Sequence, residues 1–214
     1  MKAFAVLGPW RGGTSLVTAI LHSLGVYVGD NFVDAATEYP TFEDTQLRDI
    51  CVNCFDERPQ EWRYLGTTEF RVNALRSWII EANSRAAAAG YLACGGKHPV
   101  MCKLVPDIAR AWRINGFLSP VFVSVIRSPE DVNRSWTRPE RTGQGVWWPR
   151  PDRQQVVADL ILSRDTALER FTRVEIDFKA LMDEPEKTIR NFARLCGLPE
   201  TRVSAATELV QPRP

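Results

Sequence analysis

The residues best suited to chemistry lie in one short stretch near the N-terminus, Gly8-Pro-Trp-Arg-Gly-Gly-Thr-Ser15. Glycine, arginine and hydroxyl side chains are the residue types that bind an anion through backbone N–H groups and a guanidinium. Residues 3–7 before it form an apolar run typical of a buried strand, and apolar residues after it recur at helical spacing. A glycine-rich turn between a strand and a helix N-terminus directs unpaired N–H groups toward one point, so we predict a phosphate site there.

The same stretch differs from the loop that binds nucleoside triphosphates, G-x-x-x-x-G-K-[ST]. Gly8, Gly13 and Ser15 match that pattern, but Thr14 stands at the lysine position. Because that lysine holds the terminal phosphates, its absence argues against a triphosphate bound with its metal. The positive side chain comes earlier, at Arg11. The alternative is a strand-to-helix turn that binds nothing.

A second pair of candidate anion ligands follows the apolar run 120–126. Arg127 comes directly after this predicted strand, and Ser135 lies eight residues later in a helix that is predicted to begin at Ser128-Pro129. This spacing puts a guanidinium and a hydroxyl roughly on one side, where both could contact one phosphate. The alternatives are an ion pair of Arg127 with Asp131 and a hydrogen bond of Ser135 to its own helix backbone.

The elements that must position these residues alternate between strand and helix. Apolar periodicity predicts strands over 3–7, 91–96, 120–126 and 174–178, and helices over 16–24, 43–55, 68–89, 105–114, 128–138, 154–171 and 184–196. Residues 26–41 and 138–153 are predicted loops over the site. This order predicts an α/β fold, in which residues 1–214 form a single three-layer P-loop domain with a central parallel sheet flanked by helices. Lys97 and His98 follow the 91–96 strand, at the sheet edge where ligands bind.

Composition narrows the class of protein. The chain has 214 residues with a formal net charge of +1, which does not favour a nucleic-acid binder. Its five cysteines fit free thiols better than a disulfide framework, and we interpret Cys51 and Cys54 as core thiols rather than metal ligands. No apolar run is long enough for a transmembrane segment, and the N-terminal apolar run is too short for a signal peptide. We therefore expect a cytoplasmic protein.

Taken together, the two anion motifs resemble those of the sulfotransferases that use 3′-phosphoadenosine 5′-phosphosulfate (PAPS). The pattern Gly8-x-x-Arg11-Gly12-Gly13-Thr14-Ser15 resembles the 5′-phosphosulfate loop of that family, and the stretch from Val125 through Arg127 to Ser135 resembles its 3′-phosphate motif. Residues 174–185 and 192–199 are similar to the C-terminal strand and helix of the family. The likeness is greatest to the bacterial and carbohydrate-type branch, in which arginine replaces the lysine of the loop.

The resemblance implies a function and a set of roles. The enzyme would move a sulfuryl group in line from PAPS, its co-substrate, to a hydroxyl or amine of a small-molecule, lipid or glycan acceptor, with no metal. Arg11 would contact the bridging oxygen, and Arg127 with Ser135 would hold the 3′-phosphate. The backbone amides that would hold the 5′-phosphate are those of Gly12, Gly13, Thr14 and Ser15.

The acceptor also needs a general base, for which there are two candidates. His98 comes first, because imidazole titrates near neutrality and its position resembles the catalytic histidine of the cytosolic sulfotransferases. Glu43 is the rival, since related enzymes carry a glutamate in the helix after the loop. His98 could instead be a structural replacement for an aspartate of the carbohydrate branch, and Glu43 a solvated helix acid.

Three features stay open in the sequence. The arginine-lysine-glycine segment that closes over the 3′-phosphate in the cytosolic enzymes has no counterpart here, except weakly in residues 141–145. Trp147 and Trp148 fit a loop anchor better than an acceptor platform. Alternative functions are a P-loop small-molecule or nucleotide kinase and a non-catalytic nucleotide-binding module of the same fold. The acceptor and the oligomeric state are not encoded in these motifs.

Overall fold

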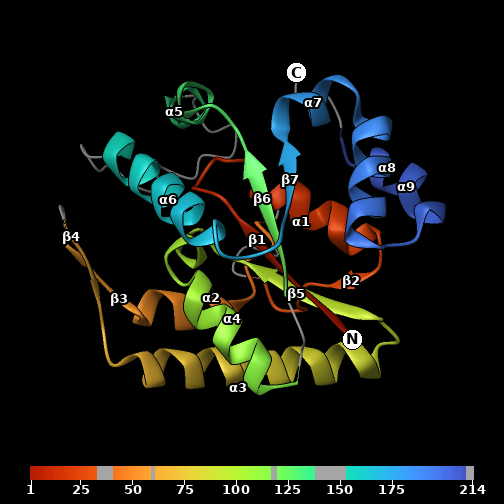
Figure 1. The fold of residues 1–214 in the computed structure, drawn as a ribbon. Helices are drawn as coiled ribbons and strands as arrows, with labels where there is room; N and C mark the ends of the chain where they lie inside the picture. The colour runs from red at the N-terminus through yellow and green to blue at the C-terminus, as the bar shows by residue number, and fades with distance from the viewer. Residues whose placement is uncertain (33–40, 59–60, 117–119, 138–152, 211–214) are drawn as a thin grey trace.

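A five-stranded parallel sheet forms the centre of the computed structural model (Figure 1), which describes residues 1–32, 41–58, 61–116, 120–137 and 153–210. The strands lie in the order β2-β5-β1-β6-β7, and every neighbouring pair is parallel. They are β1 (Lys2–Leu7), β2 (Val26–Tyr27), β5 (Ala93–Lys97), β6 (Val121–Ile126) and β7 (Arg173–Asp177). The predicted α/β fold with a central parallel sheet flanked by helices is confirmed.

Helices cover both faces of this sheet. Residues 3–7 of β1 are all apolar because successive side chains point to opposite faces and both faces are buried. Phe4 and Val6 pack on one face against α1, α8 and α9, while Ala3, Ala5 and Leu7 pack on the other face with residues of α2, α3, α4 and α6. The first layer consists of α1 (Thr14–Ser23), α8 (Pro185–Cys196) and α9 (Val203–Thr207). The second contains α2 (Thr45–Asn53), α3 (Thr68–Ala88), α4 (Val105–Ile114) and α6 (Arg153–Leu168).

Two short elements differ from the predicted ones. Residues 26 and 27 were expected in a loop but form β2, because Gly25 turns the chain at φ +99° and Val26 then pairs with Ala93. Phe178 was expected to end a strand but begins α7 (Phe178–Asp183), since the Asp177 carboxylate accepts the Ala180 N–H and caps that helix. Both changes follow from local turn chemistry, which is too short-range for apolar periodicity to detect.

A hairpin that the sequence did not predict extends from the end of α2. Its strands are β3 (Phe55–Arg58) and β4 (Glu61–Tyr64), which pair antiparallel. The ring of Tyr64 lies under the Arg71 guanidinium, 4.4 Å from ring centre to carbon, and Arg71 forms a buried ion pair with Asp107 at 2.7 Å. These contacts fasten the hairpin to α3 and α4, away from the predicted site.

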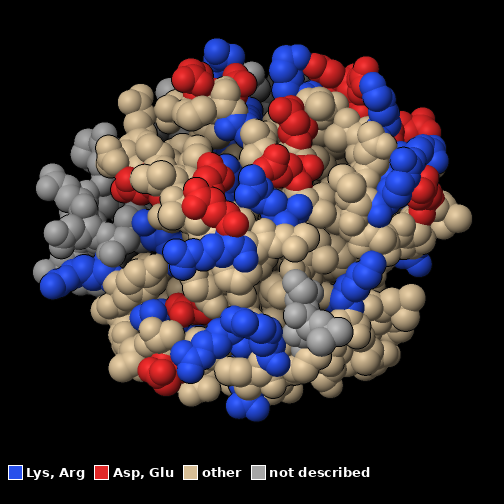
Figure 2. All heavy atoms as spheres, in the orientation of Figure 1, with Lys and Arg blue, Asp and Glu red and all other residues tan. Residues whose placement is uncertain are grey.

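The parallel sheet brings the predicted site residues to one edge. The chain leaves β1 into residues 8–13, leaves β5 at Lys97 and His98, and leaves β6 into Arg127. Since β1 pairs with both β5 and β6, these three exits are neighbours. Lys and Arg side chains are interspersed with Asp and Glu over the face shown in Figure 2.

Candidate functional site

The loop between β1 and α1 adopts a turn in which some positions accept only glycine. Gly13 has φ +91°, and a Cβ atom there would overlap the ring of Phe178. A Cβ atom on Gly12 would lie 2.8 Å from the Pro9 carbonyl oxygen. Arg11 also has a positive φ of 62°, an uncommon conformation for a residue with a side chain. The loop is therefore tightly wound, with glycine required where the backbone and Phe178 leave no space.

The N-terminus of α1 opens onto this loop. Gly13 is its N-cap residue, so no side chain satisfies the first helical N–H groups, and no acidic residue lies in the first turn. Such a helix end favours an anion through its N–H groups and its dipole. Thr14, at the lysine position of triphosphate loops, is buried. Four backbone amides were predicted to bind the anion. The Gly12 N–H already donates to the Pro9 carbonyl oxygen at 3.0 Å, so the amides that remain at the helix end are those of Gly13, Thr14 and Ser15.

Arg11, Ser135 and Arg127, which we call the arginine cluster, come together although they lie far apart in the sequence. Arg11 Nε donates to Ser135 Oγ at 3.3 Å, and Arg11 Nη2 donates to the Ser135 carbonyl oxygen at 3.2 Å. Arg127 Nη1 donates to the Arg11 carbonyl oxygen at 2.8 Å. The two predicted anion motifs thus form one continuous surface.

Arg127 and Asp131 each have another partner in the described part of the structure. Asp131 accepts from Arg134 at 3.1 Å, and its N–H is bound by the Ser128 hydroxyl. Arg127 instead lies across the loop, with its guanidinium carbon 4.5 Å from the centre of the Phe178 ring. The arginine is therefore held in place by the β1–α1 loop and by the residue that opens α7.

A second group of charged residues, which we call the glutamate cluster, consists of Glu43, Lys97 and His98. Lys97 Nζ lies 2.5 Å from Glu43 Oε1, and His98 Nε2 lies 4.0 Å from Glu43 Oε2. The side chains of Lys97 and Glu43 are only 3% and 13% exposed, so this ion pair is largely removed from water. The structure thus brings both candidate bases together, with Lys97 as a third member to which the sequence assigned no role beyond its place at a strand end.

His98 is held as a neutral imidazole. Its Nδ1 accepts the Val100 N–H at 3.3 Å and caps η1 (Pro99–Lys103), and its ring meets Trp10 edge-on at 6.2 Å between ring centres. Burial lowers the pKa of His98 from 6.5 to about 4, although the Glu43 carboxylate opposes the shift. Because Nδ1 accepts a hydrogen bond, Nε2 carries the proton and faces Glu43.

Other predicted features are resolved more simply. All five cysteines are free and buried, and burial raises the pKa of Cys51 well above its usual value, as expected for core thiols. Within the described ranges, no three His, Cys, Asp or Glu side chains are grouped to hold a metal ion. No helix in the same ranges has the length and apolar character to cross a membrane. Residues 33–40 and 138–152, which include 141–145, Trp147 and Trp148, lie outside the described residues.

Comparison with solved structures identifies the fold. The sulfotransferase domain from the curacin biosynthetic pathway aligns with a TM-score of 0.58 and 13% identity, over 99% of this chain and 78% of that one. The sulfotransferase domain from the Synechococcus PCC 7002 olefin synthase aligns at 0.56 and 13%, over 94% and 75%. A sugar kinase from Janibacter sp. HTCC2649 aligns at 0.49 and 17%, over 94% and 98%, too low a score to weigh. No protein-family model and no curated protein sequence matches the chain. The chain has a sulfotransferase-type P-loop fold.

Proposed function

We propose that this chain is a PAPS-dependent sulfotransferase that moves a sulfuryl group to a hydroxyl or amine of a small-molecule, lipid or glycan acceptor. The observation that carries the proposal is the arginine cluster, in which Arg11 of the loop is hydrogen-bonded to Ser135 of the second motif. Two anion-binding motifs that meet suit a nucleotide with phosphate groups at two positions. The likeness to two sulfotransferase domains supports it at the level of the fold.

The residues at the loop fit the 5′ end of such a donor. The helix end lacks a capping side chain, and the loop is wound so closely that a Cβ atom would fill the space at Gly12 and Gly13. The N–H groups of Gly13, Thr14 and Ser15 would bind the 5′-phosphate, and the Arg11 guanidinium would stabilise negative charge that develops on the bridging oxygen. Arg127 and Ser135 would bind the 3′-phosphate.

We assign the general base to Glu43 rather than to His98. A neutral imidazole whose Nδ1 accepts a hydrogen bond and whose Nε2 is protonated has no lone pair left to accept a proton. Glu43 is an acceptor held by Lys97 and next to His98. His98 is then a positioning residue that lies beside the glutamate, with Nε2 4.0 Å from Glu43 Oε2. Transfer itself would consist of alignment of the acceptor with the sulfur and removal of the acceptor proton by Glu43.

The site chemistry disfavours the kinase alternative. A buried Thr14 stands where a triphosphate loop requires a lysine. The non-catalytic alternative would share the donor site, so only turnover separates it from an enzyme. All five thiols are free, which supports our proposal of a reducing, cytoplasmic setting.

The direct test is turnover with PAPS. The protein is incubated with PAPS and a panel of hydroxyl and amine acceptors, and both adenosine 3′,5′-bisphosphate and sulfated product are measured by chromatography and mass spectrometry. We expect the two products to form in equal amounts and only with an acceptor present. Phosphorylation of an acceptor from ATP would establish the kinase alternative, and donor binding without any sulfated product would favour the binding module.

A further inference from the structure

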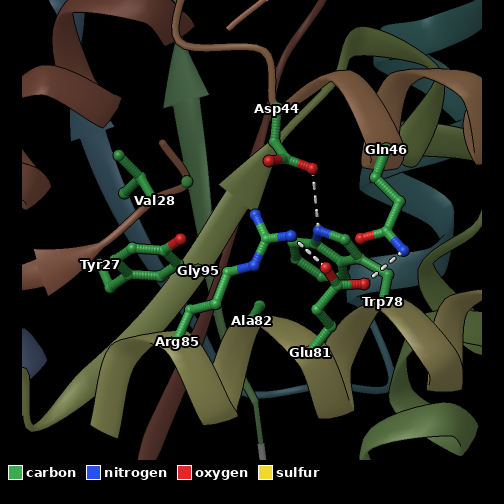
Figure 3. Close-up of a pocket in the computed structure, with 10 residues that line it drawn as sticks. Tyr27, Val28, Asp44, Gln46, Trp78, Glu81, Ala82, Arg85 and Gly95 are labelled. Carbon is green, nitrogen blue, oxygen red and sulfur yellow. Dashed lines mark hydrogen bonds and ion pairs between the residues drawn. The ribbon is translucent and has the colours of Figure 1, made fainter. Parts of the chain in front are cut away.

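Asp44, the residue after Glu43, carries a buried carboxylate to which the proposed reaction gives no role. The residue is only 6% exposed and is the N-cap of α2, where its Oδ1 accepts the Leu47 N–H at 3.0 Å. The same oxygen accepts the indole N–H of Trp78 on α3 at 3.2 Å (Figure 3). Asp44 therefore connects the helix that follows Glu43 to a second helix.

The Trp78 indole also packs against the strand that carries Lys97. A Cβ atom at Gly96, the residue before Lys97, would lie 2.7 Å from Cζ2 of this indole, so no side chain fits between the ring and the strand. One buried ring thus contacts both the residue next to Glu43 and the residue next to its ion-pair partner. The bond from Trp78 to Asp44 links the two segments that form the ion pair.

The chain around Asp44 leaves its carboxylate little room to move. Gly29 has φ +115°, and a Cβ atom there would lie 2.8 Å from Asp44 Oδ2. Asp44 also forms an antiparallel bridge with Phe32, and the Thr45 N–H donates to the Asn31 carbonyl oxygen at 2.9 Å. The entry to α2 is thus fixed by its backbone and by the Asp44 side chain together.

The residue on the other side of Glu43 is strained. Phe42 has a positive φ of 56°, and its ring packs on Phe32 with 5.2 Å between the ring centres. Such a conformation persists only where the surrounding contacts determine it, and residues of this kind cluster at functional sites. Glu43 therefore lies between a strained residue and an anchored one.

We infer that Asp44 is a positioning residue for the proposed general base: through Trp78 it holds Glu43 in place against Lys97 and beside His98. The inference rests on the proposed function, because Asp44 affects the rate in this way only if Glu43 removes the acceptor proton. Its contribution is geometric, and a displacement of a reacting group by about 1 Å costs about a hundredfold in rate.

The position of Glu43 can be followed through His98, because the chain has two histidines and His98 Nε2 lies 4.0 Å from Glu43 Oε2. The histidine ring signals are recorded by nitrogen-15 NMR at pH 7 without any ligand, and the His98 signal is the one absent from His98→Asn. We expect Asp44→Leu, which loses both hydrogen bonds, to move this signal toward its position in Glu43→Gln. In a protein that already carries Glu43→Gln, Asp44→Leu should move it no further.

Two further substitutions separate this role from support of the fold. Asp44→Asn keeps an oxygen that can accept both N–H groups, so its His98 signal and its kcat should match those of the wild type. Asp44→Ser keeps a hydroxyl that caps the helix but is too short to reach the Trp78 indole. It should fold as the wild type does and still move the His98 signal, so it decides the matter should Asp44→Leu not fold.

Steady-state kinetics with PAPS provide the second readout. Asp44→Leu is expected to lower kcat about a hundredfold, and Asp44→Ser by a smaller factor, while the Kd for adenosine 3′,5′-bisphosphate stays within about twofold of the wild-type value. The matched control is Thr67→Val, which removes the N-cap hydroxyl of α3 that accepts the Phe70 N–H at 3.2 Å. It should lower stability but leave the His98 signal and kcat unchanged.

The inference is overturned if the His98 signal keeps its wild-type position in Asp44→Leu and Asp44→Ser, if Asp44→Asn is as slow as Asp44→Leu, or if affinity for the bisphosphate falls together with the rate. If the wild type forms no sulfated product, the proposed function fails. The His98 signal without ligand still decides whether Asp44 holds Glu43 in place.

Discussion

The arginine cluster and the glutamate cluster lie at the same edge of one sheet but use charge in opposite ways. Arg11 and Arg127 keep their positive charge at any pH at which the protein folds, and their positions are fixed by hydrogen bonds to backbone and hydroxyl groups. The protonation of His98, in contrast, depends on its burial and on the Glu43 carboxylate beside it. A permanent charge suits the binding of a phosphate, while an adjustable one suits the transfer of a proton.

This difference implies that substitutions in the two clusters should have separable effects. Removal of an arginine should weaken donor binding or donor activation, whereas removal of the glutamate should lower the rate at unchanged donor affinity. If both clusters affected donor binding alike, they would form one site with one role. The following substitutions test that separation.

Glu43→Gln should have the largest effect. Loss of the general base is expected to lower kcat about a thousandfold, while the Kd for adenosine 3′,5′-bisphosphate stays within about twofold of the wild-type value. Steady-state kinetics with PAPS and calorimetry with the bisphosphate provide the two numbers. Glu69→Gln, which changes an exposed glutamate paired with Arg110, is the matched control and should leave both unchanged.

His98→Asn belongs to the same test. Asparagine can still accept the Val100 N–H, so the fold should be kept and kcat should fall less than in Glu43→Gln. A greater loss in His98→Asn than in Glu43→Gln would return the base role to His98.

Arg11→Ala should lower kcat by a few hundredfold, because one donor to the developing charge is lost. Arg11→Lys keeps a positive charge and should recover part of the rate. The kinetics are measured on variants whose melting temperatures match the wild type, since Arg11 also bonds to Ser135. A rate for Arg11→Ala within threefold of wild type would remove it from the reaction.

Arg127→Ala should act on binding rather than on rate. Loss of a charge-assisted contact to a phosphate is expected to weaken the bisphosphate by about ten- to a hundredfold. Arg190→Ala, which removes an exposed arginine paired with Glu186, is the control and should bind as the wild type does. Unchanged affinity in Arg127→Ala would contradict its assignment to the 3′-phosphate.

His98 should also make the stability of the fold depend on pH. Its pKa is about 4 in the folded chain and near 6.5 when unfolded, so between these values the unfolded chain binds a proton that the folded one does not. The free energy of unfolding should therefore fall as pH falls through this window, by up to about 3 kcal/mol from this residue. The difference between the urea midpoints at pH 7 and at pH 4.5 should be smaller in His98→Asn than in the wild type. The same pH dependence in both proteins would show that His98 is not buried as a neutral ring.

The arginine cluster could be predicted from the sequence because its parts are local patterns. Gly8 to Ser15 and Arg127 to Ser135 each run from the end of a strand into the following helix, and parallel strands bring such ends to a common edge. The helix over 105–114 was predicted with its observed bounds for a similar reason, a long apolar stripe.

The glutamate cluster could be predicted only in part. Glu43 and Lys97 are 54 residues apart, and no local pattern indicates that they pair. The neutral state of His98 depends on burial beneath Trp10 and on the Val100 N–H, neither of which a titration argument from the sequence includes.

One binding measurement tests the central claim, that two anion sites form a grip for PAPS and not for a metal-bound triphosphate. The melting temperature is recorded with adenosine 3′,5′-bisphosphate in the absence of magnesium and with ATP plus magnesium, each at about a hundred times its expected Kd. Our account predicts that the bisphosphate raises the melting temperature by several degrees and that ATP with magnesium does not. Stabilisation by ATP with magnesium, and none by the bisphosphate, would contradict it.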